Sequence, residues 1–168
     1  MTIKLFNKIS KAEKQKQLMS FCGSSTWTDQ MIKQFPFASE NNLIETATNV
    51  WYNQCSSIDW LESFTQHPKI GDVKSLSKKF AGKEQTSVAA ATKKTIAALA
   101  KANTEYQAKF GFIFIVCATG KSATEMLSLL GEMLSNNIGE ELHLAMGEQM
   151  KITKLRFKTQ ITNGHGDF

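Results

Sequence analysis

One apolar run, residues 112–118, constrains the fold of this chain more than any other feature. It is rich in β-branched and aromatic residues, and by its pattern it is a short buried strand. No other segment has strand character, so the run has no partner with which to form a sheet. Its backbone N–H and C=O groups must therefore be satisfied in another way. We expect some of them to be free to meet a polar ligand.

Helical patterns cover most of the remaining chain. Two capping boxes, 10–13 and 122–125, mark helix starts, because a serine at the N-cap and a glutamate three residues later satisfy each other's backbone N–H groups. Apolar spacing and Gly or Pro stops predict helices over the ranges 10–22, 27–34, 41–54, 58–64, 84–110, 122–134 and 140–161. We therefore expect an all-α protein: one domain over residues 1–168, built as a bundle of about seven or eight helices with one short buried extended segment near 112–118.

Composition bears on the compartment of the protein and on metal binding. No apolar run is long enough to cross a membrane, and the first six residues lack the apolar stretch of a signal peptide, so we expect a cytoplasmic protein. The three cysteines are far apart, with no Cys-x-x-Cys or His-Glu-x-x-His pattern, and a metal site is not expected.

The net charge of +5 suggests an anionic partner. Only Arg156 is an arginine, which argues against nucleic acid, since bases and phosphates favour bidentate guanidinium contacts.

His67 lies at a fixed break in the chain. Pro68 sets its own φ and disfavours helical geometry at His67, so the preceding short helix should end here. Gly71 then allows a sharp turn or a close approach to a ligand. A histidine with a defined direction that titrates near neutral pH suits acid–base chemistry. The alternative is a partly exposed loop histidine that caps the helix.

Arg156 falls on the apolar face of the last predicted helix. At about 100° per residue it shares one narrow stripe with Leu142, Ala145, Gln149 and Ile152. An inward guanidinium must be paired, because burying a bare charge is very costly. Its partner is either a carboxylate from another helix, in an internal salt bridge, or an anion or carbonyl that it clamps in a pocket.

These residues belong to motifs that resemble the OHCU decarboxylase family, the 2-oxo-4-hydroxy-4-carboxy-5-ureidoimidazoline decarboxylases of urate breakdown. The likeness extends in order over nearly the whole chain. Its motifs are the ranges 21–27, 36–37, 67–72, 84–85, 110–118 and 148–157. The His-Pro-x-Ile-Gly element combined with the later Glu-Gln pair is the most specific part.

The resemblance implies an all-α fold, no cofactor or metal, and a homodimer that converts OHCU to (S)-allantoin and CO₂. It implies that His67 and Glu84 are the catalytic histidine and glutamate and that Arg156 binds the substrate. It implies further substrate contacts, the last five through the backbone, at Pro68, Gln85, Phe114, Ile115, Val116, Cys117 and Ala118.

One position departs from the family pattern. Members commonly have a serine three residues before the catalytic glutamate, and here that place is Ala81. A missing hydroxyl contact costs roughly 0.5–1.5 kcal/mol. Two alternatives follow: a decarboxylase of a related ureido substrate, or a non-catalytic all-α module that binds a small anion or a helical partner.

Overall fold

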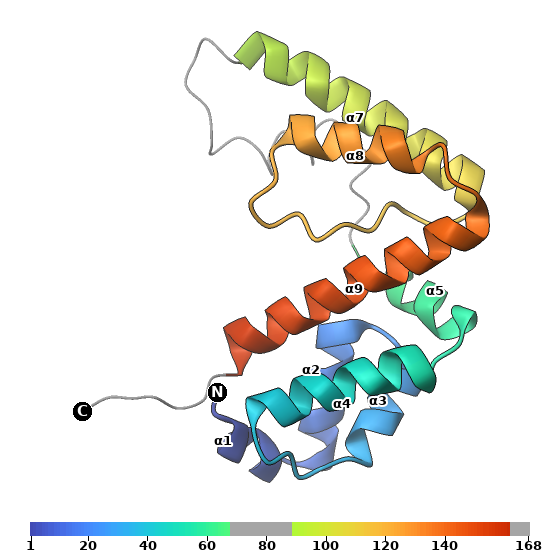
Figure 1. Ribbon diagram of the computed structural model, residues 1–168. Coiled ribbons are helices and arrows are strands. Elements are labelled where there is room, and N and C mark those ends of the chain that lie inside the picture. The colour runs from blue at the N-terminus through green and yellow to red at the C-terminus, as the bar shows by residue number, and fades with distance from the viewer. Residues whose placement is uncertain (68–88, 162–168) are drawn as a thin grey trace. The chain divides into compact units, whose positions relative to one another are not determined.

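The computed structural model describes residues 1–67 and 89–161 of the 168. Within these ranges the chain forms helices and no sheet, so the predicted all-α class is confirmed (Figure 1). The helices are α1 (Ile3–Lys8), α2 (Lys11–Cys22), α3 (Ser25–Ile32), α4 (Glu40–Asn53), α5 (Ser57–Thr65), α7 (Ala89–Phe110), α8 (Ala123–Met133) and α9 (Ile138–Gln160).

The helices divide into two compact units. The first is Met1–Gln66 with Met146–Phe168, and the second is His67–Ala145. Helix α9 contributes to both, with its first residues in the second unit and the rest in the first. The single domain expected over residues 1–168 stays a prediction.

Local sequence signals set several helix ends. Both predicted capping boxes are present, with the Ser10 hydroxyl accepting from Glu13 N–H and the Ser122 hydroxyl accepting from Glu125 N–H. Helix α2 ends where Gly23 adopts a left-handed conformation, φ 85°, and its N–H donates to Met19 O at 2.8 Å. Such a conformation favours glycine at the residue after a helix.

Aromatic residues fill the core of the first unit. The Phe21 ring packs against Phe6 and Phe157, with centroids 6.4 and 4.8 Å away. Two indoles reach across the core to backbone carbonyls: Trp27 Nε1 donates to Ala47 O at 3.0 Å and Trp51 Nε1 to Met146 O at 2.9 Å. Buried indole N–H groups need such partners, and here they bond α3 to α4 and α4 to α9.

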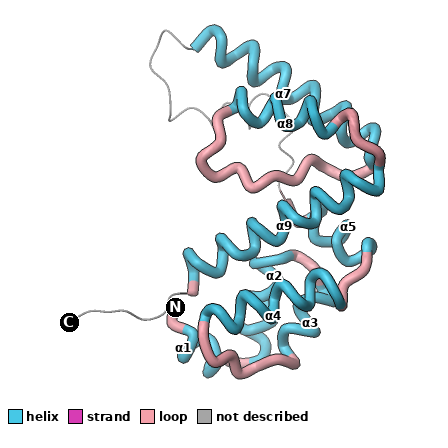
Figure 2. Tube along the Cα trace, in the orientation of Figure 1, coloured by secondary structure: helices cyan, strands magenta, loops and turns pink. Residues whose placement is uncertain are grey.

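In the second unit, α7 packs against α8, and the apolar run lies between them in the chain (Figure 2). Phe112 and the stretch 114–116 are buried. The run belongs to no helix, and in the described part of the chain it pairs with no strand, as the lack of a partner predicted. The pattern was therefore right about burial, whereas regular strand geometry is not adopted.

Candidate functional site

The structure describes some of the predicted site residues. His67 follows α5 and is half-buried, and Arg156 lies in α9 and is also half-buried. The residues Pro68, Ala81, Glu84 and Gln85 lie outside the described residues. The predicted grouping of His67 with Glu84 therefore stays a prediction.

The helix before His67 ends where we expect it to end from the presence of Pro68. Helix α5 stops at Thr65, and the C-cap residue Gln66 donates its N–H to Ser63 O at 3.1 Å. The bend at His67 follows directly. The expected position of the histidine, just after a helix end, is confirmed.

Arg156 donates to backbone carbonyls. Its Nη1 lies 3.1 Å from Ser20 O and 2.9 Å from Phe21 O, at the carboxyl end of α2. The last carbonyls of a helix lack partners inside it and carry partial negative charge. Among the described residues no carboxylate pairs with Arg156, so the internal salt bridge is not found there. The guanidinium clamps carbonyls instead.

More side chains bind the same helix end. Cys22 O accepts a short hydrogen bond from the Ser63 hydroxyl and another from Gln149 Nε2 at 3.2 Å, and Phe21 O accepts from Thr153 Oγ1 at 3.2 Å. Ser63, Gln149 and Thr153 are fully buried. Sequence reasoning missed these contacts, although Gln149 lay on the same apolar stripe as Arg156. The carboxyl end of α2, residues 20–22, is thus bonded to both α5 and α9.

Burial shifts the pKa values of two ionisable groups at this helix end. It lowers the pKa of the Arg156 guanidinium, and the nearby Cys22 thiol opposes that shift. Burial raises the pKa of Cys22 to about 12, and the neighbouring Ser63 and Thr153 hydroxyls oppose this rise. Cys22 is therefore a neutral thiol at pH 7 and no nucleophile, while Arg156 keeps its charge.

Arg156 retains donors for a ligand. Both of these hydrogen bonds use Nη1, and its Nε and Nη2 have no partner among the residues that the structure describes. These two nitrogens form one edge of the planar fork, which matches a carboxylate or a pair of carbonyl-type oxygens bidentately. With Nη1 fixed on α2, that edge has a defined direction.

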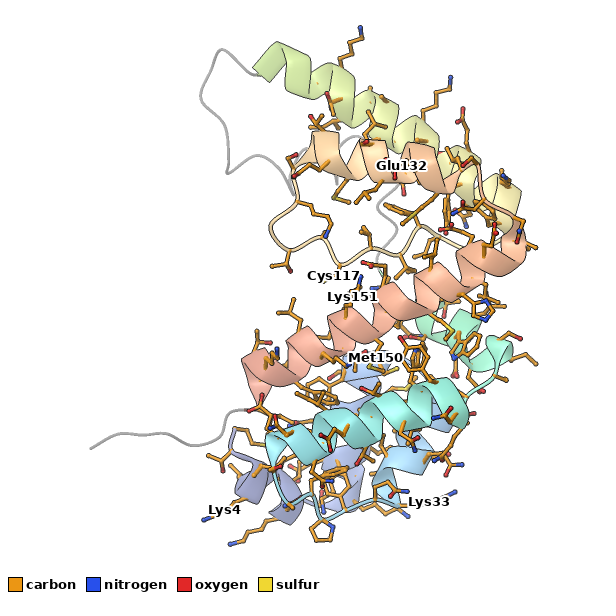
Figure 3. All side chains as sticks on the ribbon, viewed as in Figure 1. Lys4, Lys33, Cys117, Glu132, Met150 and Lys151 are labelled. Carbon is orange, nitrogen blue, oxygen red and sulfur yellow. The ribbon has the colours of Figure 1, made fainter. Side chains whose placement is uncertain are left out.

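The predicted backbone-binding segment also has donors to spare. Phe114, Ile115 and Val116 are 6%, 3% and 8% exposed, and their N–H groups have no hydrogen-bond partner in the described ranges. Buried N–H groups are seldom unpaired in proteins. The end of the segment, where Figure 3 labels Cys117, is held by a lysine that sequence reasoning missed: Lys121 donates its Nζ to Cys117 O at 2.9 Å and its N–H to Ala118 O at 3.1 Å.

Three other features of the described residues bear on possible sites. No group of His, Cys, Asp and Glu side chains there is arranged to hold a metal ion, and no helix there is long and apolar enough to span a membrane. A surface hollow of about 530 Å³ at the start of α9 is lined by Asn136, Gly139, Glu140, His143 and Leu144. None of the predicted site residues lines this hollow.

Comparisons with known proteins identify the family to which the chain is similar. The family model described as OHCU decarboxylase matches residues 7–158. The uric acid degradation bifunctional protein TTL of Arabidopsis thaliana is 41% identical over 141 residues, which cover 80% of this chain and 43% of that protein. A 2-oxo-4-hydroxy-4-carboxy-5-ureidoimidazoline decarboxylase of Xenopus laevis is 41% identical over 54 residues, covering 32% of this chain and 31% of that one. The chain thus spans less than half the length of these curated relatives.

Solved structures give a longer match. A crystal structure of OHCU decarboxylase in the presence of (S)-allantoin superposes with a TM-score of 0.72 at 38% identity, covering 85% of this chain and 95% of that chain. A structure of (S)-allantoin synthase also has a TM-score of 0.72, at 18% identity over 96% of this chain and 54% of that chain, and shows the shared fold alone. The family model and the solved relative cover most of the chain, which belongs to the OHCU decarboxylase family.

Proposed function

We propose that this protein decarboxylates OHCU to (S)-allantoin and CO₂ in urate breakdown. The observation that carries the proposal is Arg156, fixed through Nη1 on the carboxyl end of α2 with its Nε and Nη2 edge left for a ligand. The same activity is supported by the solved structure of an OHCU decarboxylase, since the match covers 95% of that chain. The net charge of +5 agrees with an anionic substrate.

The reaction breaks the bond between a carboxylate and a ring carbon that also bears a hydroxyl. The electron pair left behind needs a sink, and the conjugated ring supplies it as an enolate-type system. The protein must orient the carboxylate, stabilise the developing negative charge and deliver a proton to one face. A histidine and a glutamate suit the proton transfers, and we assign them to His67 and Glu84. We expect no cofactor.

Two sets of donors among the described residues suit the polar groups of this substrate. Arg156 can hold a carbonyl or ureido oxygen with its Nε and Nη2 edge. The N–H groups of residues 114–116, which have no partner among the described residues, can donate to the ureido group. We further infer a cytoplasmic homodimer of one domain with no nucleic-acid partner; analytical ultracentrifugation tests the oligomeric state.

The test is chiral detection of allantoin made from freshly generated OHCU. Because OHCU decays unaided to racemic allantoin, optical activity reports the enzyme alone. We expect rapid (S)-allantoin from the natural protein and a loss of about 10²–10⁴-fold in kcat/KM for His67→Ala, the range for a general acid or base. His143→Ala is the matched control, since His143 Nδ1 contacts Gly139 O of its own helix.

Three outcomes would argue otherwise. Racemate at the spontaneous rate from the natural protein would refute the activity. Unchanged turnover by His67→Ala would refute the role of His67. Faster turnover of a ureido analogue than of OHCU would favour the related substrate suggested by Ala81.

A further inference from the structure

A buried carboxylate in the second unit has no role in the proposed reaction. Glu141 is 1% exposed and lies in the first turn of α9. Its Oε1 accepts from Tyr106 Oη at 2.6 Å and its Oε2 from Asn136 Nδ2 at 3.0 Å. A buried charge is very costly unless it is bonded in this way, and the positive end of α9 also favours it. A buried carboxylate held in this way fixes the side chains that donate to it.

What Glu141 fixes is the phenol ring of Tyr106. That side chain is fully buried, and burial together with Glu141 raises the pKa of Tyr106, so the hydroxyl stays protonated and donates. The rings of Phe112 and Phe114 pack on it edge to face, with centroids 5.8 and 5.4 Å away and interplanar angles of 78° and 65°. These are preferred geometries for aromatic pairs.

The same contacts hold the segment 114–116. Phe114 begins that stretch, and its ring is set against Tyr106. Lys121 holds the other end through Cys117 O and Ala118 O. Between these two anchors, the N–H groups of 114–116 have no partner among the described residues. A chain held at both ends presents its central donors in a fixed direction.

We propose that the hydrogen bond between Tyr106 and Glu141 positions residues 114–116 to bind the substrate through their N–H groups. This inference rests on the proposed function, because it takes the segment as part of the substrate site. Tyr106 acts through Phe112 and Phe114 and touches no substrate. It is therefore a positioning residue.

The first test compares Tyr106→Phe with Tyr52→Phe. Tyr52 is the only other tyrosine, belongs to the first unit and is 41% exposed, so it controls for loss of a hydroxyl. Tyr106→Phe keeps the ring but frees it from Glu141. We expect its KM for OHCU to rise about three- to tenfold, as for one lost hydrogen bond, with kcat within about twofold. Mere loss of folded protein would lower the apparent kcat and leave KM unchanged.

A second pair tests the carboxylate. Glu141→Gln keeps an oxygen that accepts from Tyr106, whereas Glu141→Ala removes it. We expect the KM of the Gln variant to lie close to the natural value and the KM of the Ala variant to be raised. An unchanged KM in Tyr106→Phe, or equal KM values in the Gln and Ala variants, would overturn the inference.

A third measurement is independent of turnover. In uniformly ¹⁵N-labelled protein, we expect the amide signals of residues 114–116 to shift or broaden in Tyr106→Phe and to stay in place in Tyr52→Phe. Unchanged signals would overturn the inference. If the natural protein made no (S)-allantoin while these signals moved, the proposed function would fail and the anchoring of the segment would stand.

Discussion

At the scale of single residues, Arg156 shows why the type of cation matters. Its Nη1 is engaged by the Ser20 and Phe21 carbonyls, and the Nε and Nη2 edge is a separate pair of donors. A lysine offers one point charge on a flexible stem and cannot serve both partners in a fixed geometry. The only arginine of the chain thus lies where a planar fork is useful.

We therefore expect Arg156→Lys to keep the fold and lose substrate binding. Its ammonium can still donate to the α2 carbonyls, so the melting temperature should change little. Losing a bidentate, charged contact of about 1.5–3 kcal/mol corresponds to a drop of about 10- to 100-fold in kcat/KM. Steady-state kinetics measure this drop in kcat/KM. Lys158→Arg is the control, because Lys158 is an exposed residue of the same helix. A kcat/KM within twofold of the natural value would show that no ligand uses the free edge.

At the scale of elements, the corner after α2 joins three helices. Its carbonyls bind side chains of α5 and α9, and Gly23 allows α5 to approach closely. A Cβ on Gly23 would lie 2.8 Å from Cγ and 2.9 Å from Cβ of Gln66. Gln66 is the residue immediately before His67. Both the left-handed backbone and the close approach therefore require glycine here.

Gly23→Ala should be more destabilising than an ordinary substitution at a left-handed glycine. Gly111 is the matched control, because its φ is 79° and nothing lies within 4 Å of an added Cβ. Both alanine variants should lose about 1–2 kcal/mol from the left-handed backbone, and Gly23→Ala should lose more because Gln66 and the end of α5 must move. Urea unfolding of the two variants measures the difference. Equal losses would mean that α5 yields without cost.

The elements that sequence predicted well are those with local causes. The Ser10–Glu13 capping box and the stop at Gly23 depend on residues within one turn, so the ends of α2 were correctly placed. Helix α1 was missed, because six residues give little periodicity and its stability comes from burying Phe6 in the core. Arg156 was correctly placed on an inward face. Its partners were not foreseen, because backbone carbonyls at a helix end leave no mark in the pattern of side chains.

The same distinction separates His67 from Tyr106. Pro68 fixes the end of α5 locally, and the position of His67 followed from the sequence. Tyr106 and Glu141 are 35 residues apart and meet only when α7 and α9 fold together. Nothing near either residue in the sequence indicates that one is the partner of the other.

At the scale of the whole molecule, buried acids link stability to pH. Burial raises the pKa of the Cys22 thiol from 9.0 to about 12, and burial and Glu141 raise that of Tyr106 from 10.0. A group whose pKa is higher in the folded state keeps its proton there after the unfolded chain has released it. Its contribution is therefore complete below the unfolded pKa and is lost as pH rises above it. Stability should fall above about pH 9.

The alkaline loss of stability also tests whether the two units unfold together, since Cys22 lies in the first and Tyr106 in the second. A fully buried thiol contributes a slope of up to about 1.4 kcal/mol per pH unit. We expect Cys22→Ala to flatten the decline of unfolding free energy from pH 9 and Tyr106→Phe to flatten it from pH 10. Urea titrations at pH 7.5, 9, 10 and 10.5 in a phosphine reductant measure both. If one transition responds to both substitutions, the chain unfolds as the single domain expected from sequence; two transitions, each responding to one, would mean that the units are separate domains.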